Sequence, residues 1–345
     1  MQNIANISIY TGEIMSAFNI WVTEKCNLNC TYCYEGGKRS LNMTEEVVEN
    51  TISFIHENMD SNGYNLINFH GGEPLIAIET ILKIVSACNN IGGFNYSLTT
   101  NGTLLSEPVL DKLKDNRIFI SLSLDGTKKV HDLNRKKHDG TGTYDIVVNS
   151  MKLLQEREIP VRVRMTVTPE TVLELYDSVM NIVQLNAKNI VAMIDIYDNS
   201  WTNQLIDVLK EQLIRTHIEL FRSEEAEFTF YNELKKIKKG LCDGGISNYN
   251  IAIDGMIYPC SCLVNDKDYV IGSVYNGVDN RLLEKHKIYY DQRNITCSGC
   301  SNELACLSLR CKFINKTLTG KYLTAPPIIC KLEHILYDIR ALINN

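Results

Sequence analysis

Residues 26–33 read CNLNCTYC, so three cysteines, Cys26, Cys30 and Cys33, lie within eight residues. They follow a predicted strand at 18–23, which places them on a loop at the carboxyl end of that strand. Three thiolates can bind three irons of a 4Fe–4S cubane and leave the fourth iron open to another ligand. A structural zinc ion takes four ligands, usually in two pairs, and no fourth Cys or His lies nearby in the sequence. The spacing therefore favours an iron–sulfur cluster over zinc.

The sequence from 16 to 195 alternates between short apolar segments and amphipathic ones, which is typical of an α/β fold. Strands are expected at 18–23, 66–69, 96–99, 118–124, 161–167 and 190–194, with helical patterns between them. Units of this kind form a parallel sheet with its helices outside. Six units are too few for a closed eight-stranded barrel, so we predict an open partial (β/α)6 barrel. Ligands of such sheets bind at the carboxyl ends of the strands.

The composition changes along the chain and suggests four segments. We expect an N-terminal extension at 1–15, the partial barrel at 16–195, a helical bridge at 196–240 and a cysteine-rich domain at 241–345. The bridge contains a predicted amphipathic helix at 201–222. After 240, glycine, asparagine, tyrosine and cysteine dominate, which predicts a domain held together by bound ligands.

Charge and cysteine content limit the possible functions. The net charge of −6 lacks the positive field that nucleic-acid binding uses, and two short basic clusters at 135–138 and 235–239 are predicted to be solvated surface. No apolar segment is long enough to cross a membrane, and the N-terminus lacks the features of a signal peptide. We therefore expect a cytoplasmic protein without a nucleic-acid or membrane partner. Twelve cysteines in that compartment favour metal or cluster ligation over disulfides.

Further motifs follow the later strands of the predicted barrel. Residues 70–74 read HGGEP, 99–102 read TTNG, 121–126 read SLSLDG and 131–135 read HDLNR. Together with the first cysteine group, in this order, they make residues 16–195 resemble the radical SAM superfamily. The resemblance implies that Cys26, Cys30 and Cys33 hold a 4Fe–4S cluster whose open iron binds S-adenosylmethionine. One electron then cleaves the sulfonium and gives a 5′-deoxyadenosyl radical.

The resemblance also implies which side chains contact S-adenosylmethionine. Tyr32 is expected to pack against the adenine, and Arg135 to pair with the carboxylate. The amino group is expected at Gly71, Gly72 and Glu73. Ribose and carboxylate contacts fall to Thr99, Asn101, Ser121, Ser123 and Asp125, and adenine contacts to Thr166 and Val167.

The C-terminal part holds a second cysteine group of eight: Cys242, Cys260, Cys262, Cys297, Cys300, Cys306, Cys311 and Cys330. Eight thiols suit two fully ligated 4Fe–4S clusters, but also two zinc sites, so the number alone does not decide. The layout resembles the SPASM domain of peptide-modifying radical SAM enzymes, except that four residues rather than three separate Cys306 from Cys311.

The SPASM resemblance implies two auxiliary clusters and hence three 4Fe–4S clusters in the protein. Cys242, Cys260 and Cys311 would bind the inner auxiliary cluster. Either Cys262 completes its ligands or one of its irons stays open. The outer auxiliary cluster would be bound by Cys297, Cys300, Cys306 and Cys330.

Three functions were weighed from these features. A maturase of a ribosomally made peptide would form a thioether or carbon–carbon crosslink. An anaerobic sulfatase maturase would form formylglycine, but that family typically has an Asp directly after the cysteine of G-x3-P-C, where this chain has Ser261. A non-catalytic electron carrier would not need the polar residues at the strand ends. The peptide maturase is the favoured interpretation, and Asp195, at the end of the sixth strand, is a candidate acid or base.

The favoured function implies particular partners. The substrate is expected to be a precursor peptide, and a flavodoxin- or ferredoxin-type protein is expected to donate electrons. The short segment before the first strand is not long enough for a leader-binding module of its own. Leader recognition then falls to a separate protein, to the catalytic domain itself, or is not required.

Overall fold

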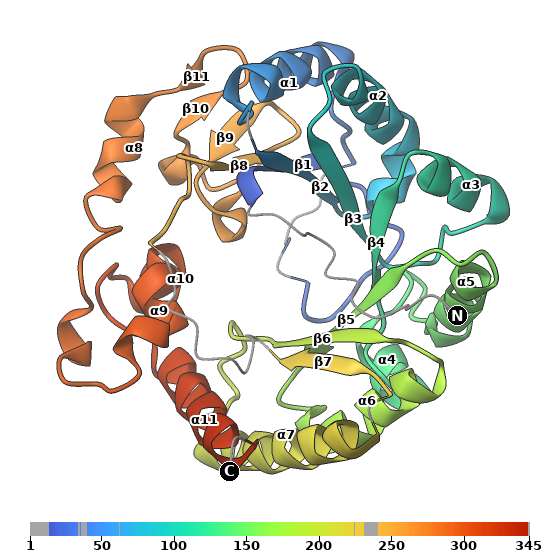
Figure 1. Ribbon diagram of the computed structural model, residues 1–345, viewed down its shortest axis with the longest axis vertical. Helices are drawn as coiled ribbons and strands as arrows, with labels where there is room; N and C mark the ends of the chain where they lie inside the picture. The colour runs from blue at the N-terminus through green and yellow to red at the C-terminus, as the bar shows by residue number, and fades with distance from the viewer. Residues whose placement is uncertain are drawn as a thin grey trace.

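The structure, a computed structural model, describes residues 14–343 apart from 34, 36–39, 62, 224 and 231–240. Its six central strands are all parallel, and strands adjacent in sequence are adjacent in the sheet. They are β1 (Ile14–Thr23), β2 (Tyr64–Gly71), β3 (Phe94–Thr100), β4 (Ile118–Ser123), β5 (Val161–Val167) and β6 (Asn189–Ile194). The sheet curls into part of a ring, with helices outside it (Figure 1). The predicted open partial barrel is confirmed.

The helices between these strands cover the outer face of the sheet. They are α1 (Glu45–Asn58), α2 (Ile78–Asn89), α3 (Glu107–Asp115), α4 (Lys128–Asn134), α5 (Tyr144–Glu156) and α6 (Leu175–Gln184). In β1 the alternating residues Phe18, Ile20 and Val22 are fully buried in the hydrophobic core with the helices. The intervening Asn19 and Trp21 therefore face the inside of the barrel.

The sheet continues beyond the six predicted strands at both edges. β7 (Glu227–Phe230) pairs with β6, in the segment predicted to be a helical bridge, where α7 (Asn203–Ser223) matches the predicted amphipathic helix. At the other edge β8 (Asn248–Ile251) pairs in parallel with β1. Antiparallel pairing then adds β9 (Met256–Tyr258), β10 (Gly272–Ser273) and β11 (Gly277–Val278). One sheet thus crosses the predicted boundary at 240, and the four domain limits stay a prediction.

The C-terminal elements complete the ring that the sheet begins (Figure 1). They include α8 (Asn280–Lys287), α9 (Leu307–Arg310), α10 (Lys312–Thr319) and α11 (Pro327–Ile343). α11 packs against α7, where Lys210 Nζ lies 2.6 Å from Asp338 Oδ2. None of the helices within the described ranges has the length and apolar character needed to span a bilayer. Most of the predicted extension at 1–15 and the basic cluster at 235–239 lie outside the described residues.

A ladder of amide side chains crosses the inner face of the sheet. Asn19 Nδ2 donates to Asn248 Oδ1 at 2.9 Å and to Asn250 Oδ1 at 3.1 Å. Asn68 Nδ2 donates to Asn19 Oδ1 at 2.9 Å, and the Ser97 hydroxyl donates to Asn68. The ladder joins β8, β1, β2 and β3 through their side chains. It makes the interior of the barrel polar at the level of these residues, in contrast to the apolar outer face.

One glycine fixes how the end of β4 packs on α6. Gly126 has a φ of +112°, and a Cβ built on it would lie 2.1 Å from Ser178 Cβ. Gly140 also has a positive φ, +84°, but a Cβ there would have nothing within 4 Å. A substitution at Gly140 would therefore introduce backbone strain alone, whereas one at Gly126 would add steric overlap.

We predict that Gly126→Ala destabilises the protein by about 1–3 kcal/mol more than Gly140→Ala, because only the first substitution overpacks a buried contact. The measurement is thermal or denaturant unfolding of both variants at equal iron content. Equal losses of stability in the two variants would contradict this prediction, because they would show that α6 shifts to accept the added methyl group without loss of free energy.

Candidate active site

The loop that carries Cys26, Cys30 and Cys33 is braced by the segment after α4. Asn29 N donates to Lys136 O at 2.7 Å, and Thr31 N donates to Asn134 O at 3.0 Å. His138 Nε2 lies 3.0 Å from Cys26 O. These contacts make the main chain of the basic cluster at 135–138 part of the cysteine loop's support. The expectation of a solvated surface there is wrong for Arg135, which is buried.

The paired glycines at the end of β2 allow the start of the cysteine loop to approach. A Cβ on Gly71 would lie 2.3 Å from Thr23 O, and one on Gly72 would lie 2.4 Å from Lys25 O. Gly72 N donates to Thr23 O at 3.1 Å, so the close approach is used for a hydrogen bond. In this structure the glycines serve the protein's own backbone, and their predicted contact with S-adenosylmethionine stays a prediction.

Glu73 ties the ends of β2 and β3 together beneath the loop. Its buried carboxylate accepts hydrogen bonds from Thr100 Oγ1 at 2.7 Å and Asn101 N at 2.8 Å. Asn101 Nδ2 in turn donates to Asn27 Oδ1 at 2.9 Å, inside the cysteine loop. The sequence predicted Glu73 and Asn101 as site residues but gave no sign of Asn27, whose partner is 74 residues away.

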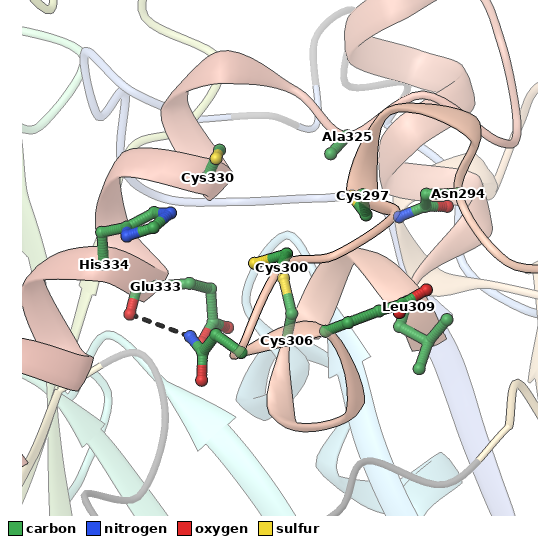
Figure 2. Close-up of a pocket in the computed structure, with 11 residues that line it drawn as sticks. Asn294, Cys297, Cys300, Cys306, Leu309, Ala325, Cys330, Glu333 and His334 are labelled. Atoms are coloured by element: carbon green, nitrogen blue, oxygen red, sulfur yellow. Dashed lines mark hydrogen bonds between the residues drawn. The ribbon is translucent and has the colours of Figure 1, made fainter.

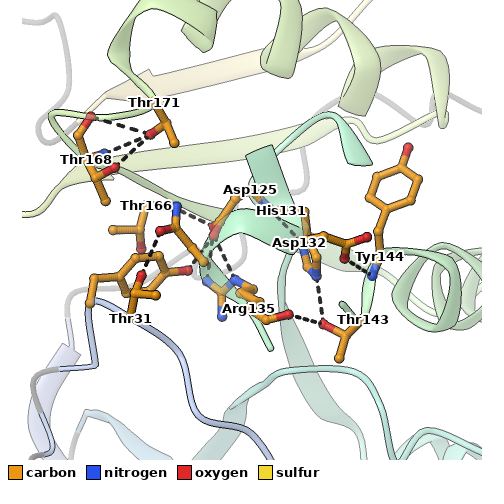
Figure 3. A network of polar contacts seen from close by, with 12 residues as sticks. Thr31, Asp125, His131, Asp132, Arg135, Thr143, Tyr144, Thr166, Thr168 and Thr171 are labelled. Carbon is orange, nitrogen blue, oxygen red and sulfur yellow. Dashed lines mark hydrogen bonds and ion pairs between the residues drawn. The ribbon is translucent and has the colours of Figure 1, made fainter. Parts of the chain in front are cut away.

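Asp125 is the centre of a second cluster of polar contacts (Figure 3). Its fully buried carboxylate accepts from Arg135 Nε at 3.0 Å, from Arg135 Nη2 at 3.1 Å and from Thr166 N at 3.0 Å. The Tyr32 hydroxyl also donates to it, and the Arg135 guanidinium lies 5.3 Å from the centre of the Tyr32 ring. Burial and then the Asp125 carboxylate raise the pKa of Tyr32, against an opposing effect of Arg135, so Tyr32 stays a hydrogen-bond donor.

His131 holds the Asp125 cluster in place from behind. Asp125 N donates to His131 Nδ1 at 3.3 Å, and His131 Nε2 lies 3.0 Å from Thr143 Oγ1, which donates to Arg135 O at 3.0 Å. Burial lowers the pKa of His131 to about 4, so the ring is neutral, and the network assigns its hydrogen to Nε2. The motif at 131–135 therefore supports the site through buried hydrogen bonds in addition to supplying Arg135.

The remaining predicted cofactor contacts lie on β3, β4 and β5. Ser121 Oγ accepts from Arg162 Nη2 at 3.0 Å on the inner face of the sheet, where Ser123 is also buried and Thr99 is paired with Ser121 in register. Val167 belongs to the hydrophobic core, and its carbonyl accepts from Asp195 N at 2.9 Å. Their roles toward S-adenosylmethionine stay predictions.

Four C-terminal cysteines line one cavity (Figure 2). They are Cys297, Cys300, Cys306 and Cys330, the set predicted for the outer cluster. Burial, helped by Glu333, raises the pKa of Cys306 to about 12. Glu333 Oε1 accepts from Leu307 N at 2.9 Å, which holds α9 and α11 together around the cavity. Three thiols from one loop and a fourth from α11, around one space, are a donor set suited to a 4Fe–4S cluster.

The other four C-terminal cysteines form an inner set. Cys260 Sγ lies 3.3 Å from Cys262 Sγ, and the charge of Cys311 acts on Cys262. Burial raises the pKa of Cys242 to about 11, and the charge of Cys260 adds to this rise. Cys262 therefore stands with the three predicted inner ligands, and the longer interval before Cys311 does not remove that residue from the group.

The geometry of these sets bears on the zinc alternative. Over the described parts of the chain, no three His, Cys, Asp or Glu side chains are grouped tightly enough to hold one metal ion. The ligands of a zinc ion converge on one point, whereas the four ligands of a cubane bind four different irons. Elemental analysis of iron and zinc distinguishes these two possibilities.

The segment that leaves β6 connects the barrel with the inner cysteines. Asp195 Oδ1 accepts from Tyr197 N at 3.0 Å, and the Tyr197 side chain hydrogen-bonds to Cys262. Burial raises the pKa of Asp195. The predicted acid or base is thus two residues from a side chain that touches the inner set.

Comparison with known proteins agrees with this geometry. Residues 20–180 match the radical SAM superfamily, and this part of the chain is a radical SAM domain. A cysteine-type anaerobic sulfatase-maturating enzyme of Clostridium perfringens is 32% identical over 159 residues, which are 42% of this chain and 42% of that protein. The chain spans about half the length of the first curated relatives it matches, 59% and 42%.

Two solved structures share the fold over most of the chain. Native anSMEcpe with bound AdoMet has a TM-score of 0.78 at 21% identity, covering 95% of this chain and 98% of that one. Streptococcus suis SuiB bound to the precursor peptide SuiA has a TM-score of 0.70 at 15% identity, covering 92% and 76%. The expected resemblance to the radical SAM superfamily is confirmed over residues 20–180, and proteins of that superfamily bind a 4Fe–4S cluster and S-adenosylmethionine. The two solved structures show that the fold they share extends over most of the chain.

We predict that Asp125→Asn lowers the unfolding free energy by about 3–5 kcal/mol, because it leaves the buried Arg135 guanidinium without its carboxylate. Binding of S-adenosylmethionine, measured by equilibrium dialysis, should weaken as well, since Tyr32 and Arg135 lose their common partner. Asp145→Asn is the matched control, because Asp145 and its partner Lys128 are both exposed. A stability loss no larger than that of the control would mean that the Asp125 cluster is not what holds the site.

Proposed function

We propose that the chain is a maturase that crosslinks a ribosomally synthesised precursor peptide through a thioether or a carbon–carbon bond. The observation that carries the proposal is the contact of Tyr197 with the inner cysteine set. Through this contact the inner cysteines, which would hold a second redox site, lie near the carboxyl end of β6. The reports of a bound peptide in SuiB and in anSMEcpe also support a peptide substrate.

The cysteine sets fit three 4Fe–4S clusters. Cys26, Cys30 and Cys33 would hold the first, and the inner and outer C-terminal sets would hold two auxiliary clusters. When bound, these groups and S-adenosylmethionine supply a carbon-centred radical and one-electron redox centres. Cys262, whose Sγ lies 3.3 Å from Cys260 Sγ, is the candidate fourth ligand of the inner cluster, and the alternative is an inner cluster with one open iron.

A side chain of the protein would accept the proton that the substrate loses. A crosslink removes two hydrogens from the peptide, one as a hydrogen atom and the other as a proton and an electron. Asp195 is suited to accept the proton, because it is partly buried and its raised pKa makes it a stronger base than an exposed carboxylate. The turn that Asp195 makes with Tyr197 N fixes its orientation.

Formylglycine formation is the second candidate, and the similarity to a sulfatase-maturating enzyme favours it. Ser261, the residue after Cys260, is exposed and begins a short 3-10 helix at Ser261–Leu263. Its hydroxyl cannot replace a carboxylate as a base at neutral pH. The peptide crosslink therefore remains the preferred proposal. An external electron donor is its predicted partner, and leader recognition falls to a separate protein, to the catalytic domain itself, or is not required.

We predict that the anaerobically reconstituted protein holds about twelve irons, as three cubanes require. The triple variant Cys26/Cys30/Cys33→Ala should retain about eight irons and lose cleavage of S-adenosylmethionine. Iron and zinc are measured by elemental analysis. Cys88→Ala is the control, because Cys88 is buried in α2 away from the three sets and its loss should leave the iron content unchanged. Stoichiometric zinc with only about four irons would contradict the two auxiliary clusters.

We predict that cysteine-rich precursor peptides incubated with the enzyme, a reductant and S-adenosylmethionine become lighter by two hydrogens. Mass spectrometry with fragmentation checks the mass and locates the crosslink. The Cys26→Ala variant should give no product from the same peptides. Aldehyde formation on a sulfatase-type peptide, without two-hydrogen loss on any precursor, would establish the second candidate instead, and Asp195 would be the first base to test.

A further inference from the structure

A lysine is completely buried between the C-terminal cysteines. Lys312 is the first residue of α10, directly after Cys311, and has 0% exposure. Its ammonium has three donor hydrogens. Asn294 Oδ1, 2.9 Å from Lys312 Nζ, is a neutral acceptor. Among the described residues no carboxylate forms an ion pair with Lys312. Burying an ammonium in this way is unfavourable unless negative charge lies close by.

Cysteines of both sets lie within electrostatic range of Lys312, and they carry negative charge as thiolates when a cluster is bound. Burial lowers the pKa of Lys312, whereas the charges of Cys297 and Cys242, and more weakly of Glu303 and Cys306, raise it. Cys297 and Cys306 belong to the outer set and Cys242 to the inner set. The partner Asn294 itself lines the cavity of the outer set (Figure 2). Lys312 thus bonds to a side chain that lines the outer cavity and directly follows Cys311 of the inner set, so it lies beside both sets.

The side chains that position Lys312 are neutral and buried. Asn294 Nδ2 donates to Ser308 Oγ at 2.9 Å, and Ser308 Oγ donates to Asn315 Oδ1 at 2.8 Å. Asn294, Ser308 and Asn315 are each at most 3% exposed. This network fixes the location of the ammonium but supplies no counter-charge, so the partner that compensates the buried cation has to be anionic.

We propose that Lys312 is a shared counter-charge for the two auxiliary clusters and raises the reduction potential of both. The inference rests on the proposed function, in which the two sets hold 4Fe–4S clusters. Thiolate-ligated clusters carry negative charge that increases on reduction, so a fixed cation stabilises the reduced form. Because one ammonium lies close to both sets, its favourable interaction with the added electron applies to each cluster separately. Lys312 acts on the reduction potentials of the clusters and has no direct role at the substrate.

The test is a redox titration, followed by EPR, of the fully reconstituted protein with Lys312→Met. The expected result is a shift of both auxiliary potentials to more negative values, with the potential of the first cluster unchanged. Lys316→Met is the matched control, because Lys316 lies one turn further along α10 with its ammonium at the surface, bonded to Gly320 O. That control should leave all potentials where they are in the unchanged protein. A Lys312→Met protein with full iron content and unshifted auxiliary potentials, or with only one of them shifted, overturns the proposal.

If Lys312→Met loses iron, the variant Lys312→Arg, which keeps the positive charge, distinguishes the possible causes. Recovery of both the iron content and the potentials in Lys312→Arg supports the counter-charge. Failure of Lys312→Arg to load iron shows that shape and not charge is required, and overturns it. The iron content of the unchanged protein separates this outcome from the proposed function, since a protein without auxiliary clusters would lack their EPR signals before any substitution.

Discussion

The buried ion pair between Asp125 and Arg135 is the interaction on which the candidate site depends. Asp125 lies just after β4 and Arg135 just after α4, and the same carboxylate binds the Thr166 amide of β5 and the Tyr32 hydroxyl of the cysteine loop. A bidentate pair of this kind sets both distance and orientation. Two strands, one helix and the cluster loop are thereby fixed relative to one another through a single carboxylate.

The sequence predicts the parts of this fold that have a strong local pattern. Buried alternating residues such as Phe18 and Ile20 identify the barrel strands, and cysteine spacing identifies the first candidate ligand set. The division of the C-terminal cysteines into two sets follows from the resemblance to the SPASM domain. β7 and β8–β11 were not predicted, because strands of two to four residues leave no period to detect and exist only by pairing with a neighbour. The pairing of β8 with β1 links residues about 230 positions apart, which no local pattern records.

In the candidate site, too, the sequence identifies individual residues but not the contacts between them. The motifs supplied Asp125, Arg135 and Tyr32 as individual candidates, yet their mutual hydrogen bonds could not be read from the sequence. The basic cluster at 135–138 has the composition of a solvated surface, and its charges give no sign that its main chain, at Lys136 O, accepts a hydrogen bond from Asn29 N. Lys312 likewise follows a cysteine without any signal that it is buried, since lysine is among the residues least often found inside.

The pairing of β1 with β8 has a consequence for synthesis of the chain on the ribosome. β1 emerges early and meets β2 soon afterwards, but its other edge stays open until residues 248–251 have been made. An open edge of a parallel sheet is a template for pairing with other chains. Asn19, which later binds Asn248 and Asn250, is a polar side chain on that edge strand, facing inward. Until the cysteine-rich segment has been synthesised, the open edge of β1 in the nascent barrel is exposed, and the polar Asn19 protects it only in part.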